Sequence, residues 1–213
     1  MNLEKKNASL SVKDGKFLPI SEDFYTLQGE GEHSGKAAYF IRLAGCNVKC
    51  AWCDSKDSWD ASIFPLVSIS NIVAKVMQTS ADTVIITGGE PLMHNLDFLC
   101  KKLHENKYKI FLETSGSSEY SGSFDWICLS PKKNRHPLDN IYEKASEIKI
   151  VISDIQDFKW AEENASKANK NCMLFLQPEW SKRDKILPMI IQYIKDNPKW
   201  RLSIQSHKYI NIP

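Results

Sequence analysis

The chain has 213 residues, of which 42% are hydrophobic and 25% are charged, an ordinary balance for a globular protein with one full core. A formal charge of only +2 argues against the basic surface of a nucleic-acid-binding protein or of a protein that binds anionic membranes. No apolar stretch of signal-peptide length follows Lys5 and Lys6, and apolar runs such as residues 37–41 are too short to span a membrane. We therefore expect a soluble, cytoplasmic protein that binds neither nucleic acid nor membrane.

Residues 1–20 are polar and weakly patterned, which is typical of an edge segment or a loosely ordered arm. Apolar positions at i, i+3, i+4 and i+7 predict a helix over residues 69–77, with Ser68 as its N-cap, and another over residues 96–103. Helical patterns also cover residues 155–168 and 184–195, where Pro188 predicts a late start or a kink. Strands are expected at residues 38–43, 83–87, 109–113, 125–129, 147–152, 172–177 and 200–204.

Strands that alternate with helices predict one α/β domain over residues 1–213, with a mainly parallel sheet and helices on its outer face. Right-handed crossovers curl such a sheet into a barrel, but a complete eight-stranded TIM barrel takes about 250 residues. An incomplete, TIM-type barrel therefore fits this chain better. Ligands bind at the carboxyl ends of the strands in this architecture. Polar or glycine-containing segments follow the predicted strands there, at residues 46–53, 87–91, 113–116, 130–132 and 177–178.

Cysteines are unevenly distributed along the chain. Cys46, Cys50 and Cys53 lie within eight residues, whereas the other three cysteines stand alone in apolar stretches and are expected to be small core residues. Clustered thiols in a chain without a visible export signal indicate a metal rather than disulfides. Thiolates suit iron–sulfur clusters, zinc or Cu(I), and three protein ligands leave one position open for reaction. A zinc knot completed by His33 or a distant cysteine is the alternative.

Two motifs together resemble the radical S-adenosylmethionine (SAM) superfamily. The cysteine spacing, with Trp52 before the third cysteine, is similar to that of the superfamily, and the GGEP segment at residues 88–91 follows a strand, as it does there. The resemblance implies a radical SAM domain in which Cys46, Cys50 and Cys53 hold a [4Fe–4S] cluster. SAM would chelate the fourth iron, and the GGEP segment would contact the SAM amino group.

Further segments resemble one family, 7-carboxy-7-deazaguanine synthase (the QueE family). They are TLQGEG at residues 26–31, RLAGCN at 42–47, WCD at 52–54, ETSG at 113–116, SPK at 130–132, LQP at 176–178 and QSHK at 205–208. The resemblance implies conversion of 6-carboxy-5,6,7,8-tetrahydropterin to 7-carboxy-7-deazaguanine, with ring contraction and loss of ammonia, on the way to queuosine and related deazapurines. It also implies SAM and Mg²⁺ as cofactors, a flavodoxin or ferredoxin as electron donor, and a homodimer.

Site residues follow from the same resemblance. Arg42, at a strand end, suits a bidentate grip on a carboxylate, with a surface ion pair as the alternative; Lys132 is either a SAM contact or a solvated rim lysine. Ser55 stands where many members of the family have a threonine whose hydroxyl contacts Mg²⁺; serine keeps that oxygen but loses a methyl group. Expected substrate contacts are Leu27, Gln28, Gly29, Glu30, Arg42, Thr87, His207 and Pro213, and expected SAM contacts are Trp52, Asp54, Gly88, Gly89, Glu90, Ser130, Lys132 and Gln177.

Two other functions are compatible with the cysteine loop alone. An activase that generates a glycyl radical on a partner protein shares the Cys-x₃-Cys-x₂-Cys spacing and a similar size. A non-catalytic zinc or iron–sulfur module needs no SAM at all. The TLQGEG segment and the last residues of the chain are not expected in an activase, and metal analysis separates the module from the enzyme.

Overall fold

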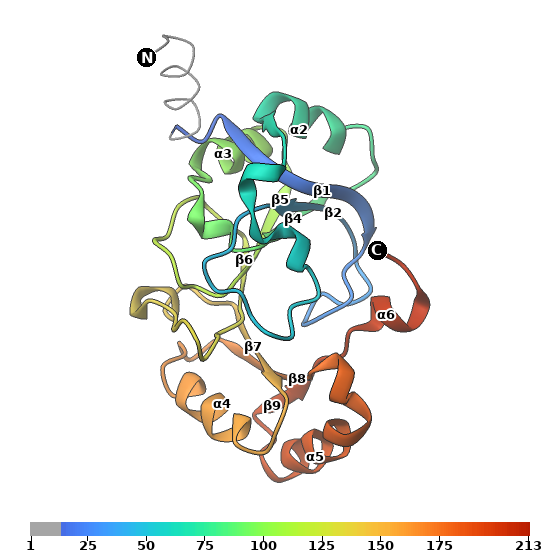
Figure 1. Cartoon of the computed structure of the whole chain (residues 1–213), viewed down its shortest axis with the longest axis vertical. Helices are drawn as coiled ribbons and strands as arrows, with labels where there is room; N and C mark the ends of the chain where they lie inside the picture. The colour runs from blue at the N-terminus through green and yellow to red at the C-terminus, as the bar shows by residue number, and fades with distance from the viewer. Residues whose placement is uncertain (1–13) are drawn as a thin grey trace.

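A computed structural model describes residues 14–213. The nine strands of this part of the chain form one sheet in the order β3-β1-β2-β4-β5-β6-β7-β8-β9 (Figure 1). No helix within this part of the chain is long and apolar enough to cross a membrane. The strands are β1 (Phe17–Leu27), β2 (Ala37–Leu43), β3 (Leu66–Ser68), β4 (Thr83–Gly88), β5 (Lys109–Thr114), β6 (Trp126–Leu129), β7 (Glu147–Ile152), β8 (Met173–Pro178) and β9 (Trp200–Leu202). The α-helices are α2 (Ile69–Val76), α3 (Asp97–Glu105), α4 (Asp157–Ala165), α5 (Arg183–Asp196) and α6 (Ser206–Ile210).

The sheet is a curved but open array. Strands β2 and β4 to β9 pair in parallel, whereas β1 pairs antiparallel with both β2 and β3. Its edges, β3 and β9, do not pair with each other, so the barrel is incomplete, as the chain length predicts. Figure 1 shows the sheet winding from β1 to β9, with α2 and α3 beside the first strands and α4 and α5 beside the last.

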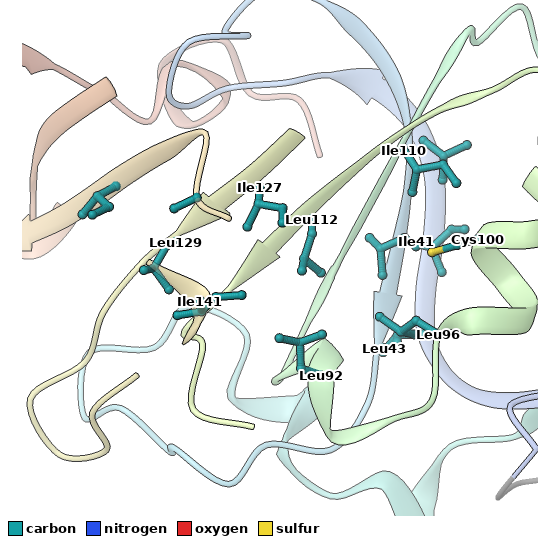
Figure 2. Close-up of a cluster of buried hydrophobic side chains, with 14 of the residues drawn as sticks. Ile41, Leu43, Leu92, Leu96, Cys100, Ile110, Leu112, Ile127, Leu129 and Ile141 are labelled. Carbon is teal, nitrogen blue, oxygen red and sulfur yellow. The ribbon is translucent and has the colours of Figure 1, made fainter. Parts of the chain in front are cut away.

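Helices cover the outer face of the sheet because every second strand residue points toward them. On β7, Ile148, Ile150 and Ile152 are fully buried in the main core, while Glu147 and Lys149 point to the other face. Figure 2 shows this core continuing across β2, β5 and β6 to α3, where Cys100 packs as a small apolar residue. Ser68 caps α2 by accepting a hydrogen bond from the backbone N–H of Asn71 (3.3 Å), which confirms the predicted N-cap.

The connection between β1 and β2 crosses the inner face of the sheet. The Gly31 N–H donates to the Ser203 hydroxyl beyond β9, and the Glu32 N–H donates to a Glu147 carboxylate oxygen on β7, each over 3.0 Å. His33 stacks on Phe111 of β5, with ring centroids 4.4 Å apart. These contacts close the interior of the partial barrel at the amino-terminal ends of the strands. The cavity at the carboxyl ends of the strands therefore has a floor.

Two features differ from the sequence-based prediction. Residues 1–13 lie outside the described residues, but from Phe17 the expected arm is a long strand, β1, because it pairs with both β2 and β3. The predicted late start of α5 is wrong: the helix begins at Arg183 and continues through Pro188. Pro188 removes one hydrogen bond, to the carbonyl of Asp184, and both residues are exposed, so the helix tolerates this loss at its solvent face.

Candidate active site

A cavity of about 700 Å³ opens at the carboxyl ends of the strands. This volume is within the usual range for a small-molecule site. The end of β1, the cysteine loop, the ends of β2 and β4 to β8, and α6 all contribute to its wall. Every site residue predicted from the sequence lines this cavity except Glu90. Segments that are distant in the sequence therefore form one site, as the predicted strand ends imply.

The cysteine loop presents Cys46, Cys50 and Cys53 to this cavity. Its first part is anchored by the Cys46 N–H, which donates to the carbonyl of Trp59 over 3.1 Å. Within residues 14–213, no three His, Cys, Asp or Glu side chains converge closely enough to hold a single metal ion. Three thiolates that border one cavity are a donor set that suits an iron–sulfur cluster with one iron left open.

A zinc knot also lacks the fourth ligand that the sequence left open. His33 lies below the floor, stacked on Phe111 and hydrogen-bonded through Nδ1 to the Lys36 ammonium (3.0 Å). Cys100 and Cys128 are buried, and neither lines the cavity. The thiols of the loop therefore receive no further protein ligand from these residues.

Lys132 turns toward the cysteine loop rather than into solvent. Its ammonium lies 5.5 Å from the centroid of the Trp52 ring and donates to the Ser130 carbonyl over 2.7 Å. Burial lowers the pKa of Lys132, while the nearby Cys50 acts to raise it. Burial also raises the pKa of the Cys50 thiol, and Lys132 opposes that shift. A cation held beside the cluster loop suits an anionic group, such as the carboxylate of an amino acid cofactor.

The backbone of the GGEP segment is in close contact with the backbone at the start of the cysteine loop. The Gly89 N–H donates to the Leu43 carbonyl (2.9 Å), and a Cβ at Gly89 would lie 2.2 Å from the carbonyl oxygen of Gly45. Any other residue at this position would push the two loops apart. Gly88 and Gly89 line the cavity, so their backbone is within reach of a ligand.

Glu90, which the sequence predicts as a SAM contact, has a buried side chain. It is 1% exposed and does not line the cavity. Its carboxylate accepts hydrogen bonds from the Leu92 N–H (3.1 Å), the Ser115 N–H (2.8 Å) and the hydroxyls of Thr114 and Ser115. The side chain therefore joins the GGEP segment to the end of β5.

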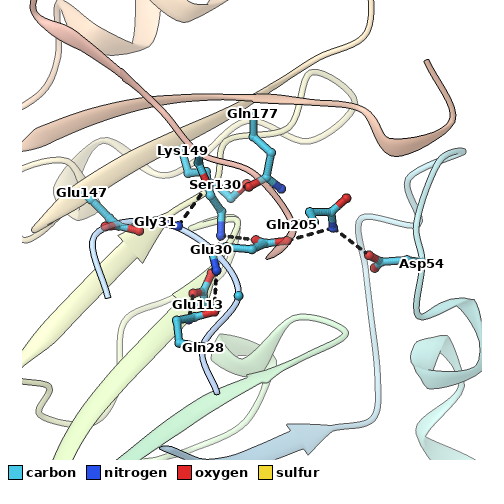
Figure 3. Close-up of polar contacts among 12 residues, drawn as sticks. Gln28, Glu30, Gly31, Asp54, Glu113, Ser130, Glu147, Lys149, Gln177 and Gln205 are labelled. Atoms are coloured by element: carbon cyan, nitrogen blue, oxygen red, sulfur yellow. Dashed lines mark hydrogen bonds and ion pairs between the residues drawn. The ribbon is translucent and has the colours of Figure 1, made fainter. Parts of the chain in front are cut away.

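The floor of the cavity is a network of charged side chains around the buried Lys149 (Figure 3). The Lys149 ammonium lies 2.5 Å from a Glu30 oxygen and 3.0 Å from a Glu113 oxygen. Gln205 donates to the other Glu30 oxygen over 2.8 Å, and Gln28 donates to the other Glu113 oxygen over 3.0 Å. Burial acts to raise the pKa of Glu30, but the charge and hydrogen bond of Lys149 outweigh it and lower this pKa to about 2. Glu30 is thus an anion at neutral pH.

Helix α6 fastens the carboxyl-terminal segment over the cavity. The Ser206 N–H donates to the Gly29 carbonyl (2.9 Å), and the Lys208 ammonium pairs with Asp54 (3.0 Å). A Cβ at Gly29 would lie 2.1 Å from Nδ1 of His207, so glycine is required for this close approach. Burial lowers the pKa of His207, which favours its neutral form. Asp54 therefore links the cysteine loop to α6 and also lines the cavity.

Arg42 makes the ion pair that was one of its two expected roles, and it also lines the cavity. It lies directly opposite Glu22 in the β1–β2 register, and its Nε is 2.5 Å from a Glu22 oxygen. Both side chains line the cavity. An arginine has five N–H donors, so this pair orients the guanidinium and leaves its outer face for an anionic ligand.

Several residues that line the cavity were not predicted from the sequence, because the strand predictions did not consider which residues face the inside of the sheet. Lys149 lies in an apolar run in which only the alternation of Glu147 and Lys149 marks an inward-facing polar side. In a parallel sheet covered on both faces such polar residues are unusual, and this signal could have identified Lys149. Glu113 and Gln205 were noted only as parts of motifs, and their contacts with Gln28 and Glu30 depend on tertiary structure.

Comparisons with known proteins agree with this geometry. Residues 40–122 match the family model of the radical SAM superfamily. The chain is 48% identical to the 7-carboxy-7-deazaguanine synthase of Flavobacterium psychrophilum, over 98% of this chain and 99% of that protein. It is 37% identical to the synthase of Escherichia coli K12, over 91% of this chain and 98% of that protein. The crystal structure of QueE from Escherichia coli superposes with a TM-score of 0.81 at 33% identity, covering 93% of this chain and 98% of that one.

Proposed function

Because the chain belongs to the 7-carboxy-7-deazaguanine synthase family of radical SAM enzymes, we propose that its cavity holds cluster, SAM and pterin side by side. The function is conversion of 6-carboxy-5,6,7,8-tetrahydropterin to 7-carboxy-7-deazaguanine, a step of queuosine biosynthesis that releases ammonia. The observation that carries this assignment is the single cavity, which brings the three loop thiols together with the TLQGEG segment and α6. Neither the activase nor the zinc module gains support from the comparisons.

Cys46, Cys50 and Cys53 would hold the [4Fe–4S] cluster, and the open side of the loop would admit SAM. Cluster and SAM together supply the removal of a hydrogen atom from the substrate. The residues that line the SAM end of the cavity bind and orient it: Lys132 and Ser130 would meet its carboxylate, and the Gly88–Gly89 backbone its amino group. The remaining proposed SAM contacts are Trp52, Asp54 and Gln177.

At the other end, Leu27, Gln28, Gly29 and Glu30 would border the pterin ring, and Arg42 would bind its carboxylate through the N–H groups that face away from Glu22. His207 is neutral at pH 7 because burial lowers its pKa, so it can accept a proton. Thr87 and Pro213 also line this end and are proposed as substrate contacts.

Mg²⁺ would bind between the two ligands at Ser55. Ser55 lines the cavity, and its hydroxyl oxygen lies 3.7 Å from Cys53 Sγ in the cysteine loop. A hydroxyl oxygen is a suitable hard ligand, with water and ligand oxygens completing the octahedron. One protein ligand is weak anchoring, and the ion would therefore exchange readily.

The remaining parts of the proposal concern the whole protein. One radical SAM domain, a homodimer, a cytoplasmic location and a flavodoxin or ferredoxin as the external electron donor are proposed on family resemblance. The need for a reductant supports the electron donor, because the conversion itself supplies no electron to the cluster.

The test is a comparison of substrates under identical conditions. Cluster-reconstituted protein receives SAM, Mg²⁺ and reductant with either 6-carboxytetrahydropterin or a glycyl-radical partner protein, and mass spectrometry follows 7-carboxy-7-deazaguanine. We expect this product with the pterin and no glycyl radical on the protein. Cleavage of SAM without the product would retain the radical enzyme but contradict the proposed substrate.

A further inference from the structure

The inference concerns Lys149, which no motif of the sequence marks. This lysine projects from the inner face of β7 and is 3% exposed, yet it lines the cavity. Its ammonium bridges Glu30 and Glu113, and the second oxygen of each carboxylate is held by an amide, from Gln205 and Gln28 respectively (Figure 3). Each carboxylate is therefore held by two contacts, one with the shared Lys149 ammonium and one with a side-chain amide.

Two partly buried carboxylates that share one partner disfavour each other's ionised form unless a cation lies between them. Lys149 supplies that cation: burial acts to lower its pKa, but the surrounding groups raise it well above its usual value. Glu147, the next inward residue on β7, behaves differently, because burial and the charge of Glu113 raise its pKa. Lys149 thus keeps Glu30 ionised and pairs with Glu113, while the pKa of Glu147 is raised.

We propose that Lys149 is a positioning residue that sets substrate specificity, because it fixes Glu30 and Glu113 as paired acceptors facing the pterin. An ammonium has three N–H donors, and the two carboxylates use two of them. The floor therefore offers two acceptor groups and one donor. A 2-amino-4-oxopyrimidine edge is complementary, with two N–H donors and one carbonyl acceptor. A 2,4-dioxopyrimidine edge has the opposite balance and would place a carbonyl against a carboxylate. The proposal rests on the proposed function, since it specifies how that substrate is selected.

The test measures binding rather than turnover. Cluster-reconstituted protein with SAM, but without reductant, is titrated calorimetrically with 6-carboxypterin and with 6-carboxylumazine, which differ in the 2-amino group. We expect the wild type to prefer the pterin by about 100-fold or more, because a buried acceptor left facing a carbonyl is strongly unfavourable. In Lys149→Met this preference should fall by at least about tenfold, because one carboxyl then takes up a proton and becomes a donor. Lys149→Arg, which keeps the charge, should recover part of it.

The pH dependence separates this role from a loss of packing. In the wild type, Glu30 is ionised throughout the range from about pH 5.5 to about pH 7.5, so it contributes no change in pterin affinity there. In Lys149→Met the affinity should rise with pH over this range, as the protonated carboxyl ionises. The titratable groups that face Lys149 are Glu30, Glu113, Cys128, Glu147, Lys132 and His207, and they are the same in both proteins.

Two further variants keep the outcome interpretable. Glu113→Gln replaces one acceptor without removing the cation, and it should also lower the preference if Lys149→Met does not fold. Lys101→Met, an exposed lysine on α3, is the matched control and should bind as the wild type does. An unchanged preference in both Lys149→Met and Glu113→Gln would overturn the proposal, as would a wild type that binds pterin and lumazine equally. Wild-type turnover of the tetrahydropterin is measured in parallel, so a failure of the proposed function is seen separately.

Discussion

A substitution of Glu90 tests whether its side chain stabilises the fold or binds SAM. Replacing it with glutamine keeps its shape but turns one carboxylate oxygen into an NH₂ group. Each oxygen accepts from one backbone N–H, either that of Leu92 or that of Ser115, so one of these buried donors loses its partner whichever way the amide is oriented. An unsatisfied buried donor costs about 1–3 kcal/mol, and the lost charge assistance of the remaining bonds adds to it.

We therefore expect Glu90→Gln to lower the free energy of unfolding by about 2–4 kcal/mol. For a chain of this size each kcal/mol lowers Tm by about 2–4 °C, so the apoprotein should melt at least about 4 °C earlier. The assay is thermal and urea unfolding of protein without cluster or SAM. Glu105→Gln, at the exposed end of α3, is the matched control and should leave the midpoint unchanged. A stable Glu90→Gln protein that has lost SAM affinity would refute the structural role and restore Glu90 as a ligand.

Substitutions at three further positions test other parts of the site. Ser55→Ala should abolish the response of turnover to Mg²⁺, and Ser55→Thr should lower the Mg²⁺ concentration for half-maximal activity; equal responses in all three proteins would exclude Ser55 as a ligand. The depressed pKa of Glu30 means that its ion pair stabilises the fold above the ordinary value of 4.5 and loses this effect as pH falls through about 2. The difference in urea midpoint between wild type and Glu30→Gln should therefore shrink between pH 4.5 and about 2, and a constant difference would contradict the ion pair. Gly29→Ala should force α6 off the cavity because of the clash with His207, which would raise KM for the pterin by about tenfold or more; an unchanged KM would show that α6 does not shape the site.

Most of the fold could be predicted because its parallel strands are short apolar runs that alternate with amphipathic helices. The first strand could not, because β1 reads as polar: its sequence PISEDFYT places few apolar residues in alternation, and it is held by pairing on both sides. The short helix α6 has five residues and no side-chain cap, so its sequence carries no local signal. Its position depends on contacts with Gly29 and Asp54.

For the site, local motifs predicted which loops meet but not which way each side chain turns. The GGEP segment lies beside the cysteine loop as predicted, yet its glutamate points to the end of β5 rather than to the cavity. The charged floor was missed for the opposite reason. Lys149, Glu113 and Glu30 come from three distant segments, and only the inward alternation on β5 and β7 brings them together.

The most direct test of the central claim is turnover by wild type and Cys50→Ala, reconstituted and assayed side by side with SAM, Mg²⁺, reductant and 6-carboxytetrahydropterin. We predict that the wild type forms 7-carboxy-7-deazaguanine, and that Cys50→Ala, which loses a thiol facing the cavity, binds less iron and sulfide and forms none. Product formed by Cys50→Ala at the wild-type rate would contradict the account, because the reaction would then not depend on the cluster held by this loop.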